Sequence, residues 1–284
     1  MNVLMPTTLE EACAMAARPC ELPLIPMAGA TDLLVHWPLR QLEHDKTYLD
    51  LSGIASLRAF SWSAESLTLG ALTTYWDILR DTTAAKEFPL LIEAARQVGA
   101  VQIQSRGTWA GNIANGSPAA DGVPVLMALD AQVVLTSTSG SRSVALSDYY
   151  TGYRASVRKR EELISKIIIP RRRHDFTAFH KVGPRRAQAI TKVGVAIAHQ
   201  HGAHSEGWRI VANSVAPTVR RCRAVEAMLN TAEPVKSAAD FLHALSTDIS
   251  PIDDIRSTAD YRRTVLSRLL YHTLRGSGLC PWIK

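Results

Sequence analysis

The sequence predicts an α+β protein. Apolar runs that read as strands alternate with segments of helical periodicity along the whole chain. A length of 284 residues suits one large domain or two. A charged connector over residues 171–175 interrupts the succession of elements. We therefore expect two domains, the first over residues 1–174 and a smaller one over residues 175–284.

The first domain is expected to mix helices with short strands. Thr7 or Thr8 can cap the first helix, and Pro89 starts a helix that Gly99 ends. The predicted strands cover residues 22–27, 48–51, 67–71, 131–136, 143–146 and 163–169. The predicted helices cover residues 7–18, 75–80, 89–98 and 123–129, and a short helix starts within 147–150. Apolar residues 33–35 form a further element, and the sequence does not decide between helix and strand there.

The second domain begins with residues 177–182 and 191–199, which are strands or helix starts. Residues 208–212 predict a strand and residues 223–229 a helix. The last stretch is helical, over residues 241–245 and then 259–274. One stripe of the last helix carries Tyr261, Val265, Leu269 and His272.

The composition is that of a soluble protein with a substantial core, because 46% of the residues are apolar and 20% are charged. No run approaches the roughly 18 apolar residues that cross a bilayer. The first residues lack the basic flank and apolar core of a signal peptide. We therefore expect a cytoplasmic protein without a membrane span.

The chain has a net charge of +6, and its basic residues concentrate at 154–173 and 185–192. A nucleic-acid surface is one interpretation of these clusters. The aromatic residues nearby do not form a platform on which bases could stack. An ordinary solvated or partner-facing surface is therefore favoured over nucleic-acid binding.

Two segments rich in small residues are the candidate ligand loops. Residues 28–32 follow a predicted strand, and residues 107–122 hold four glycines and two asparagines. Glycine lets the backbone touch a ligand directly. Hydroxyl, amide and backbone N–H groups bind anionic oxygens. A surface turn would account for either segment alone, but the two together suit the pyrophosphate of a cofactor.

Motifs for other chemistries are absent from the sequence. There is no H-E-x-x-H, G-x-S-x-G, P-loop or G-x-G-x-x-G, and no evident pair of carboxylates. The four cysteines lie far apart, so an iron–sulphur cluster or zinc site in this chain is not expected. His199, His201 and His204 fall in a predicted turn that favours a structural loop over a metal site. We expect no catalytic and no metal-binding residue.

A diphosphate-bearing cofactor held between the two loops explains both of them, and it would supply the chemistry. Flavin is favoured over nicotinamide. The nicotinamide fingerprint is a single glycine-rich turn within one unit, whereas the glycines of this chain are split between distant segments.

At these residues the chain resembles the FAD-binding subunits of the molybdenum hydroxylases, the xanthine dehydrogenase and carbon monoxide dehydrogenase family. Residues 24–33 are similar to the family's first loop, and residues 102–115 with Ser117, Pro118 and Asp121 are similar to its second. Further similar stretches at 161–170, 179–186 and 216–218 follow in the family's order, so the resemblance covers nearly the whole chain.

The resemblance implies an FAD-binding domain of the two-subdomain type found in the p-cresol methylhydroxylase and vanillyl-alcohol oxidase enzymes, divided near residue 57. A C-terminal domain of the CO dehydrogenase flavoprotein type would follow. Asp121 would hold the ribityl or ribose side, and Ile164 and Lys181 would approach the isoalloxazine. From the residues alone, Ile164 reads as core and Lys181 as solvated. The residues implied to wrap the diphosphate are Met27, Ala28, Gly29, Ala30, Thr31, Asp32, Thr108, Trp109, Ala110, Gly111 and Asn112.

The chain departs from the family pattern at three places. Ala30 and Ala110 each replace a glycine of a double-glycine pair. Each adds a methyl group beside the phosphates, with strain of about 1 kcal/mol if the backbone φ is positive. Ala189 stands where the family commonly has aspartate, which puts the use of NAD by this chain in question.

The resemblance implies an electron-transfer subunit. A large partner would carry molybdopterin and a small partner two 2Fe-2S clusters, in a dimer of heterotrimers, that is, a heterohexamer. Electrons would pass through FAD to NAD, a quinone, a cytochrome or oxygen. The alternatives are a stand-alone flavin oxidoreductase and a scaffold that has lost its flavin. The sequence does not identify the substrate, and purines, N-heteroaromatic compounds, aldehydes and carbon monoxide all stay open.

Overall fold

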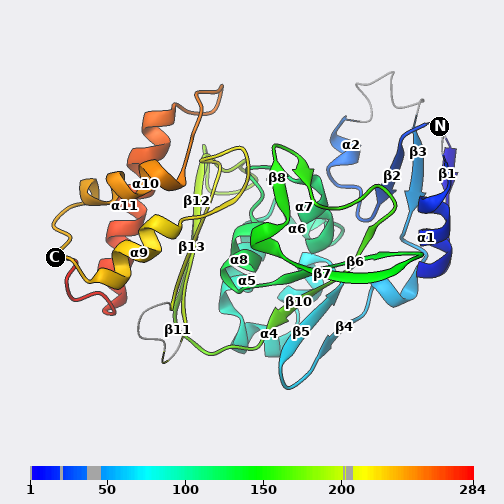
Figure 1. Cartoon of the computed structure of the whole chain (residues 1–284), viewed down its shortest axis with the longest axis horizontal. Helices are drawn as coiled ribbons and strands as arrows, with labels where there is room; N and C mark the ends of the chain where they lie inside the picture. Colours follow the sequence, from blue (N-terminus) through cyan, green and yellow to red (C-terminus); the bar gives the residue numbers. More distant parts are fainter. Residues whose placement is uncertain (1, 20–21, 37–45, 201, 203–206) are drawn as a thin grey trace.

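The computed structural model describes residues 2–19, 22–36, 46–200, 202 and 207–284, and Figure 1 shows their arrangement. The predicted α+β class is confirmed, because helices and strands alternate along the chain and the strands form separate sheets. A small parallel sheet lies near the N-terminus, a larger antiparallel sheet occupies the middle, and a third sheet carries the C-terminal helices (Figure 1).

The first sheet is parallel and has the order β1-β3-β2. Its strands are β1 (Asn2–Leu4), β2 (Leu24–Met27) and β3 (Thr47–Asp50). Helix α1 (Leu9–Ala17) follows β1, and its cap Thr8 accepts from the Glu11 amide at 3.1 Å. Helix α2 (Leu33–His36) follows β2, and its Leu34 and Val35 are exposed although the sequence there is apolar.

The second sheet is antiparallel and has the order β4-β5-β10-β6-β7. Its strands are β4 (Phe60–Trp62), β5 (Ser66–Gly70), β6 (Gln132–Ser137), β7 (Gly140–Ala145) and β10 (Leu163–Pro170). The predicted division near residue 57 falls between this sheet and the first one. A bulge at Ser165 interrupts the pairing of β10 with β6, next to Ile164. Bulges of this kind commonly redirect a side chain toward a site.

Six helices of the first domain follow β5 in the chain and precede β6. They are α3 (Tyr75–Leu79), α4 (Thr82–Glu87), α5 (Pro89–Gln97), α6 (Val101–Gln104), α7 (Trp109–Asn115) and α8 (Gly122–Ala128). The short helices α4 and α6 are missing from the sequence prediction. A 3-10 turn, Leu146–Asp148, stands where a short helix is predicted, and it leads into the hairpin of β8 (Tyr150–Gly152) and β9 (Ala155–Ser156).

The prediction of a loop over residues 107–122 is wrong in part, because α7 occupies its centre. Thr108 caps this helix by accepting from the Gly111 amide at 2.9 Å. Trp109, Ala110 and Ile113 then bury one face of it. Packing of these three residues outweighs the poor helix propensity of the glycine and the asparagines around them.

The C-terminal sheet is antiparallel and lies between two sets of helices (Figure 1). Its strands, in order, are β11 (His174–Val182), β12 (Val193–Gln200), β13 (Trp208–Asn213) and β14 (Arg220–Arg221). Helices α5 and α8 of the first domain contact one face. The other face carries α9 (Arg223–Thr231), α10 (Phe241–Asp248) and α11 (Ala259–Ser277), of which α9 and α11 contact the strands.

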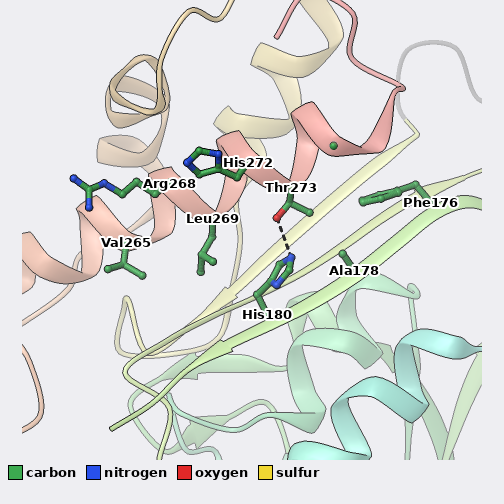
Figure 2. Close-up of a pocket in the computed structure, with 9 residues that line it drawn as sticks. Phe176, Ala178, His180, Val265, Arg268, Leu269, His272 and Thr273 are labelled. Atoms are coloured by element: carbon green, nitrogen blue, oxygen red, sulfur yellow. Dashed lines mark hydrogen bonds between the residues drawn. The ribbon is translucent and has the colours of Figure 1, made fainter. Parts of the chain in front are cut away.

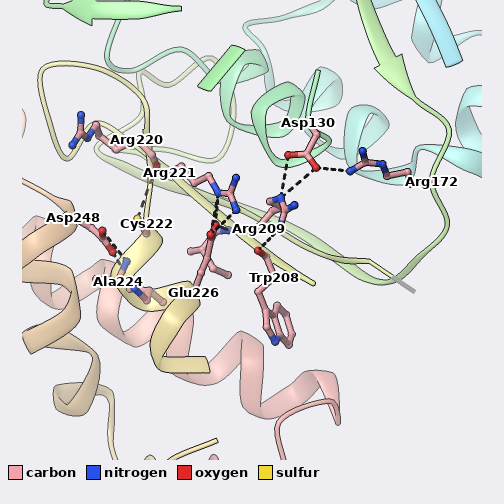
Figure 3. Close-up of polar contacts among 12 residues, drawn as sticks. Asp130, Arg172, Trp208, Arg209, Arg220, Arg221, Cys222, Ala224, Glu226 and Asp248 are labelled. Atoms are coloured by element: carbon pink, nitrogen blue, oxygen red, sulfur yellow. Dashed lines mark hydrogen bonds and ion pairs between the residues drawn. The ribbon is translucent and has the colours of Figure 1, made fainter. Parts of the chain in front are cut away.

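Ion pairs tie the connector and the C-terminal sheet to the end of α8 (Figure 3). The Asp130 carboxylate accepts from Arg172 Nη1 at 2.7 Å and from Arg209 Nε at 3.0 Å. In the same view, Arg221 donates to Glu226 at the start of α9. The Ile210 amide also donates to Glu226, at 2.9 Å. The two domains therefore share a continuous polar and apolar contact.

The predicted stripe on α11 is not the buried face of that helix. Val265, Leu269 and His272 instead line a groove of about 560 Å³ between α11 and β11 (Figure 2). The buried face carries Arg262, which donates to the Asp254 carboxylate at 2.7 Å and to the Ser214 carbonyl oxygen at 2.5 Å. A buried arginine needs such partners, so these bonds fix the rotation of the helix.

Candidate functional site

A cavity of about 530 Å³ opens where β2, α3, α6, α7 and β10 meet. The turn after β2 forms one wall, and the start of α7 forms the opposite wall. Its lining residues are Leu24, Ile25, Pro26, Ala28, Gly29, Ala30, Thr31, Asp32, Leu33, Val35, Leu51, Ala71, Tyr75, Val98, Ile103, Gly107, Thr108, Ala110, Gly111, Asn112, Ala114, Asn115, Arg158, Leu163 and Ile164. Both predicted ligand segments therefore border the same space.

Two glycines allow the walls to touch. A Cβ atom on Gly29 would lie 1.8 Å from the Arg106 carbonyl oxygen, and a Cβ on Gly107 would lie 3.4 Å from Thr31 Oγ1. Asn115 Nδ2 also donates to Asp32 Oδ1 at 3.1 Å, which joins α7 to the first turn. The close backbone approach leaves no room for a side chain at Gly29.

The start of α7 faces the cavity and suits an anionic group. First-turn amides of a helix lack acceptors within the helix and carry a partial positive charge. Ala110 and Gly111, in that first turn, both line the cavity, although the Gly111 amide already donates to Thr108 Oγ1. Arg158 adds a cation to the lining. The negative charge of a diphosphate would therefore be partly balanced by this wall.

Most of the predicted site residues border the cavity, namely Ala28, Gly29, Ala30, Thr31, Asp32, Thr108, Ala110, Gly111, Asn112 and Ile164. Trp109 instead lies fully buried in the core, with its ring 4.5 Å from that of Tyr75, and its amide donates to the Thr73 carbonyl oxygen. Met27 ends β2 between the lining residues Pro26 and Ala28 and does not itself line the cavity. Cofactor contacts by these residues stay predictions.

Asp121 and Lys181 lie behind the cavity wall and form a buried ion pair. Lys181 Nζ donates to Asp121 Oδ2 at 2.6 Å and to the Gln97 carbonyl oxygen at 2.8 Å. The interpretation of Lys181 as solvated is wrong, because its side chain is 6% exposed. Burial raises the pKa of the Asp121 carboxyl, while Lys181 and hydrogen bonds from Thr191 and Asn213 act to lower it.

Tyr75 is a cavity-lining residue that the sequence analysis missed. Its side chain is 2% exposed, and its hydroxyl has no hydrogen-bond partner among the described residues. Burial, with Asp121 nearby, raises the pKa of this phenol, so it is protonated at neutral pH. The sequence signals only a helix start at Tyr75, because Thr74 forms a capping box with Asp77. Only the three-dimensional fold shows that Tyr75 lies at the cavity.

The two glycine replacements differ in their backbone. Ala30 has φ +57°, in the left-handed region that glycine favours, whereas Ala110 lies inside α7. We expect Ala30→Gly to raise the free energy of unfolding by about 0.5–1 kcal/mol, because relief of strain exceeds the added freedom of the unfolded chain. Thermal unfolding of the FAD-free chain measures this change.

Ala110→Gly is the matched control. It should lower stability by about 0.5–1 kcal/mol, because glycine costs that amount inside a helix. Equal effects of the two substitutions would contradict the left-handed conformation at Ala30.

No group of three His, Cys, Asp or Glu side chains in the described part of the chain is placed to hold a metal ion. His201 and His204 lie outside the described residues. No described helix is both long and apolar enough to cross a membrane.

Family models match both parts of the chain. The model described as the FAD binding domain in molybdopterin dehydrogenase matches residues 1–172. The model described as the CO dehydrogenase flavoprotein C-terminal domain matches residues 178–276.

Curated relatives extend this similarity over most of the chain. The glyceraldehyde dehydrogenase medium chain of Sulfolobus acidocaldarius is 32% identical over 246 residues, which cover 86% of this chain and 87% of that protein. The carbon monoxide dehydrogenase medium chain of Hydrogenophaga pseudoflava is 27% identical, with 88% of each chain covered. The xanthine dehydrogenase FAD-binding subunit of Escherichia coli O157:H7 is 28% identical, with 89% of each covered.

Solved structures share the fold. A chain of carbon monoxide dehydrogenase from Hydrogenophaga pseudoflava superposes with a TM-score of 0.88 at 24% identity, and covers 98% of this chain and 97% of its own. A chain of quinoline 2-oxidoreductase from Pseudomonas putida 86 gives a TM-score of 0.82 at 22% identity, with 98% of each chain covered.

Proposed function

The chain belongs to the FAD-binding medium subunits of the molybdenum hydroxylases, and we propose that it passes electrons from a partner's iron–sulphur clusters through FAD to an external acceptor. It is thus one subunit of an oxidoreductase, and FAD is the cofactor of its first domain. The observation that carries the proposal is the meeting of two distant segments around one cavity, with Gly29 pressed against the Arg106 backbone.

The residues at the cavity fit FAD. When bound, FAD supplies electron transfer in single or paired steps. The turn over residues 28–32 and the start of α7 would hold the diphosphate, with Arg158 as a nearby cation. The Tyr75 hydroxyl, which has no hydrogen-bond partner in the described part of the chain, leaves a polar group in the wall. Ile164, beside the bulge of β10, offers an apolar surface for the isoalloxazine.

Partners supply what this chain does not contain. The relatives are named as medium chains or FAD-binding subunits, which implies companion chains. We propose a large chain with molybdopterin and a small chain with two 2Fe-2S clusters, assembled as a dimer of heterotrimers in the cytoplasm. NAD, a quinone, a cytochrome and oxygen are the candidate acceptors.

The experiment is reoxidation of the co-purified complex after anaerobic reduction. The cluster signals are followed by electron paramagnetic resonance and the flavin by visible absorption, while each candidate acceptor is added in turn. One acceptor should reoxidise clusters and flavin together. A complex rebuilt with the FAD-free chain should keep its clusters reduced.

Two results would contradict the proposal. Clusters that reoxidise equally fast without FAD would show that this chain does not carry the electrons. Partners that contain neither iron nor molybdenum would favour the stand-alone oxidoreductase instead.

A further inference from the structure

The C-terminal domain holds residues 118–122 of the first domain, a segment that lies behind the cavity wall. This segment connects α7 to α8 and ends at Asp121 and Gly122. Donors of the C-terminal domain bind this segment at several points: Ser214 N to Pro118 O at 2.7 Å, Asn213 Nδ2 to Ala120 O at 2.8 Å, Thr191 Oγ1 to Asp121 Oδ1 at 2.5 Å, and Lys181 Nζ to Asp121 Oδ2 at 2.6 Å. Asn213 also hydrogen-bonds the Asp121 carboxyl.

The 118–122 segment is coupled to the cavity through its last residue. The Gly122 amide donates to Asn112 Oδ1 at 3.2 Å, and Asn112 lines the cavity. A Cβ atom on Gly122 would lie 3.0 Å from Asn112 Oδ1 and 2.8 Å from the Tyr75 hydroxyl oxygen. The contact is therefore tight, and a shift of the segment would move cavity-lining residues.

Lys181 couples the same segment to a second part of the wall. Its ammonium group bridges Asp121 and the Gln97 carbonyl oxygen, and Val98, the next residue, lines the cavity. The Lys181 ammonium group thus links the end of α5 to the start of α8.

Thr191 is well placed to fix that carboxylate. Its side chain is 1% exposed, and its carbonyl oxygen accepts from Ser214 Oγ at 2.9 Å, so the residue itself is held in place. A buried carboxylate depends on donors for each oxygen, and hydrogen bonds to charged groups are the strong ones. Lys181 donates to Oδ2 of Asp121 and Thr191 donates to Oδ1, while Asn213 makes a smaller contribution.

We propose that Thr191 is a positioning residue of the cofactor site. Its hydroxyl fixes the Asp121 carboxylate beside Lys181, and the C-terminal domain thereby controls how tightly the first domain holds FAD. The inference rests on the proposed binding of FAD and adds the second domain to that site.

The inference predicts in which direction the pH of FAD release shifts when the Thr191 hydroxyl is removed. Among the described residues, the charged or titratable groups that face Asp121 are Lys181 on β11 and the Tyr75 phenol on α3. The phenol stays protonated, because burial raises its pKa. Loss of the Thr191 donor raises the pKa of the Asp121 carboxyl, so the carboxylate is protonated at a higher pH than in the wild type.

The experiment compares Thr191→Val and Thr191→Ser in the full chain. Valine keeps the shape of the side chain without the hydroxyl, and serine keeps the hydroxyl. Release of FAD is followed by its fluorescence as the pH is lowered. Thr191→Val should bind FAD about tenfold more weakly at neutral pH and release it about one pH unit higher than wild type. Thr191→Ser should restore values near those of wild type.

Several outcomes would overturn the inference. One is wild-type affinity and wild-type release pH in Thr191→Val. Another is equal, pH-independent weakening in both variants, which would show a merely structural role. If Thr191→Val does not fold, Asp121→Asn decides: its FAD release should no longer respond to mild acid, and an unchanged response would refute the role of Asp121. A wild-type chain that binds no FAD would instead refute the proposed function.

Discussion

Gly29→Ala is expected to cost about 2–3 kcal/mol of stability and to weaken FAD binding about 100-fold or more. The new Cβ atom would lie 1.8 Å from the Arg106 carbonyl oxygen, a distance that no side-chain rotation can relieve because both atoms belong to the backbone frame. The turn over residues 28–32 must then move away from the start of α7. Thermal unfolding and an FAD titration of the same preparation measure the two effects.

Gly276→Ala is the matched control for this substitution. Gly276 lies in α11, and apart from its chain neighbours and the nearby backbone of its own helix, no heavy atom of the described residues would come within 4 Å of its Cβ atom. Alanine inside a helix is favoured over glycine by about 1 kcal/mol, so this variant should be slightly more stable and bind FAD as wild type does. Wild-type FAD affinity in Gly29→Ala would contradict the close contact of the two segments.

Lys181→Met is the second substitution with a large expected effect. It removes the cation from a pair whose side chains are 6% and 11% exposed, and leaves the Asp121 carboxylate buried with fewer donors. Breaking a buried pair in this way costs about 3–5 kcal/mol. The free energy of unfolding, measured with denaturant, should fall by this amount.

Asp121→Asn combined with Lys181→Met separates the two roles of the pair. The double variant contains no unpaired charge, so it should recover most of the lost stability. It should still bind FAD more weakly than wild type if the pair contributes to the cofactor site. Full recovery of FAD affinity would mean that the pair is structural only.

The local sequence was sufficient to predict those helices whose ends carry a capping or helix-breaking residue. Pro89 and Gly99 bracket α5, and Thr8 caps α1, as their residue types predict. Packing across long sequence distances decided the rest. The glycine-rich stretch after Gly107 is helical because Trp109 and Ile113 are buried, and no local signal shows that burial.

The sequence predicted the two segments that form the candidate site, but not the residues from other elements that surround them. Small residues at 28–32 and 107–122 predicted two ligand segments, and parts of both line the same cavity. Tyr75 and Thr191 carried no signal, because their neighbours at Asp121 and Gly122 are known only from the fold. From the residues alone Lys181 was wrongly interpreted as solvated for the same reason, since its partners Asp121 and Gln97 are distant in sequence.

Uptake of FAD by the full chain, freed of cofactor and titrated with FAD, tests the central claim most directly. Visible absorption and the loss of flavin fluorescence report binding, and the flavin released on denaturation is identified as FAD. The account predicts saturable, stoichiometric uptake by the wild-type chain and loss of uptake in Gly29→Ala. A folded wild-type chain that takes up no FAD would contradict it and would favour a scaffold that has lost its flavin.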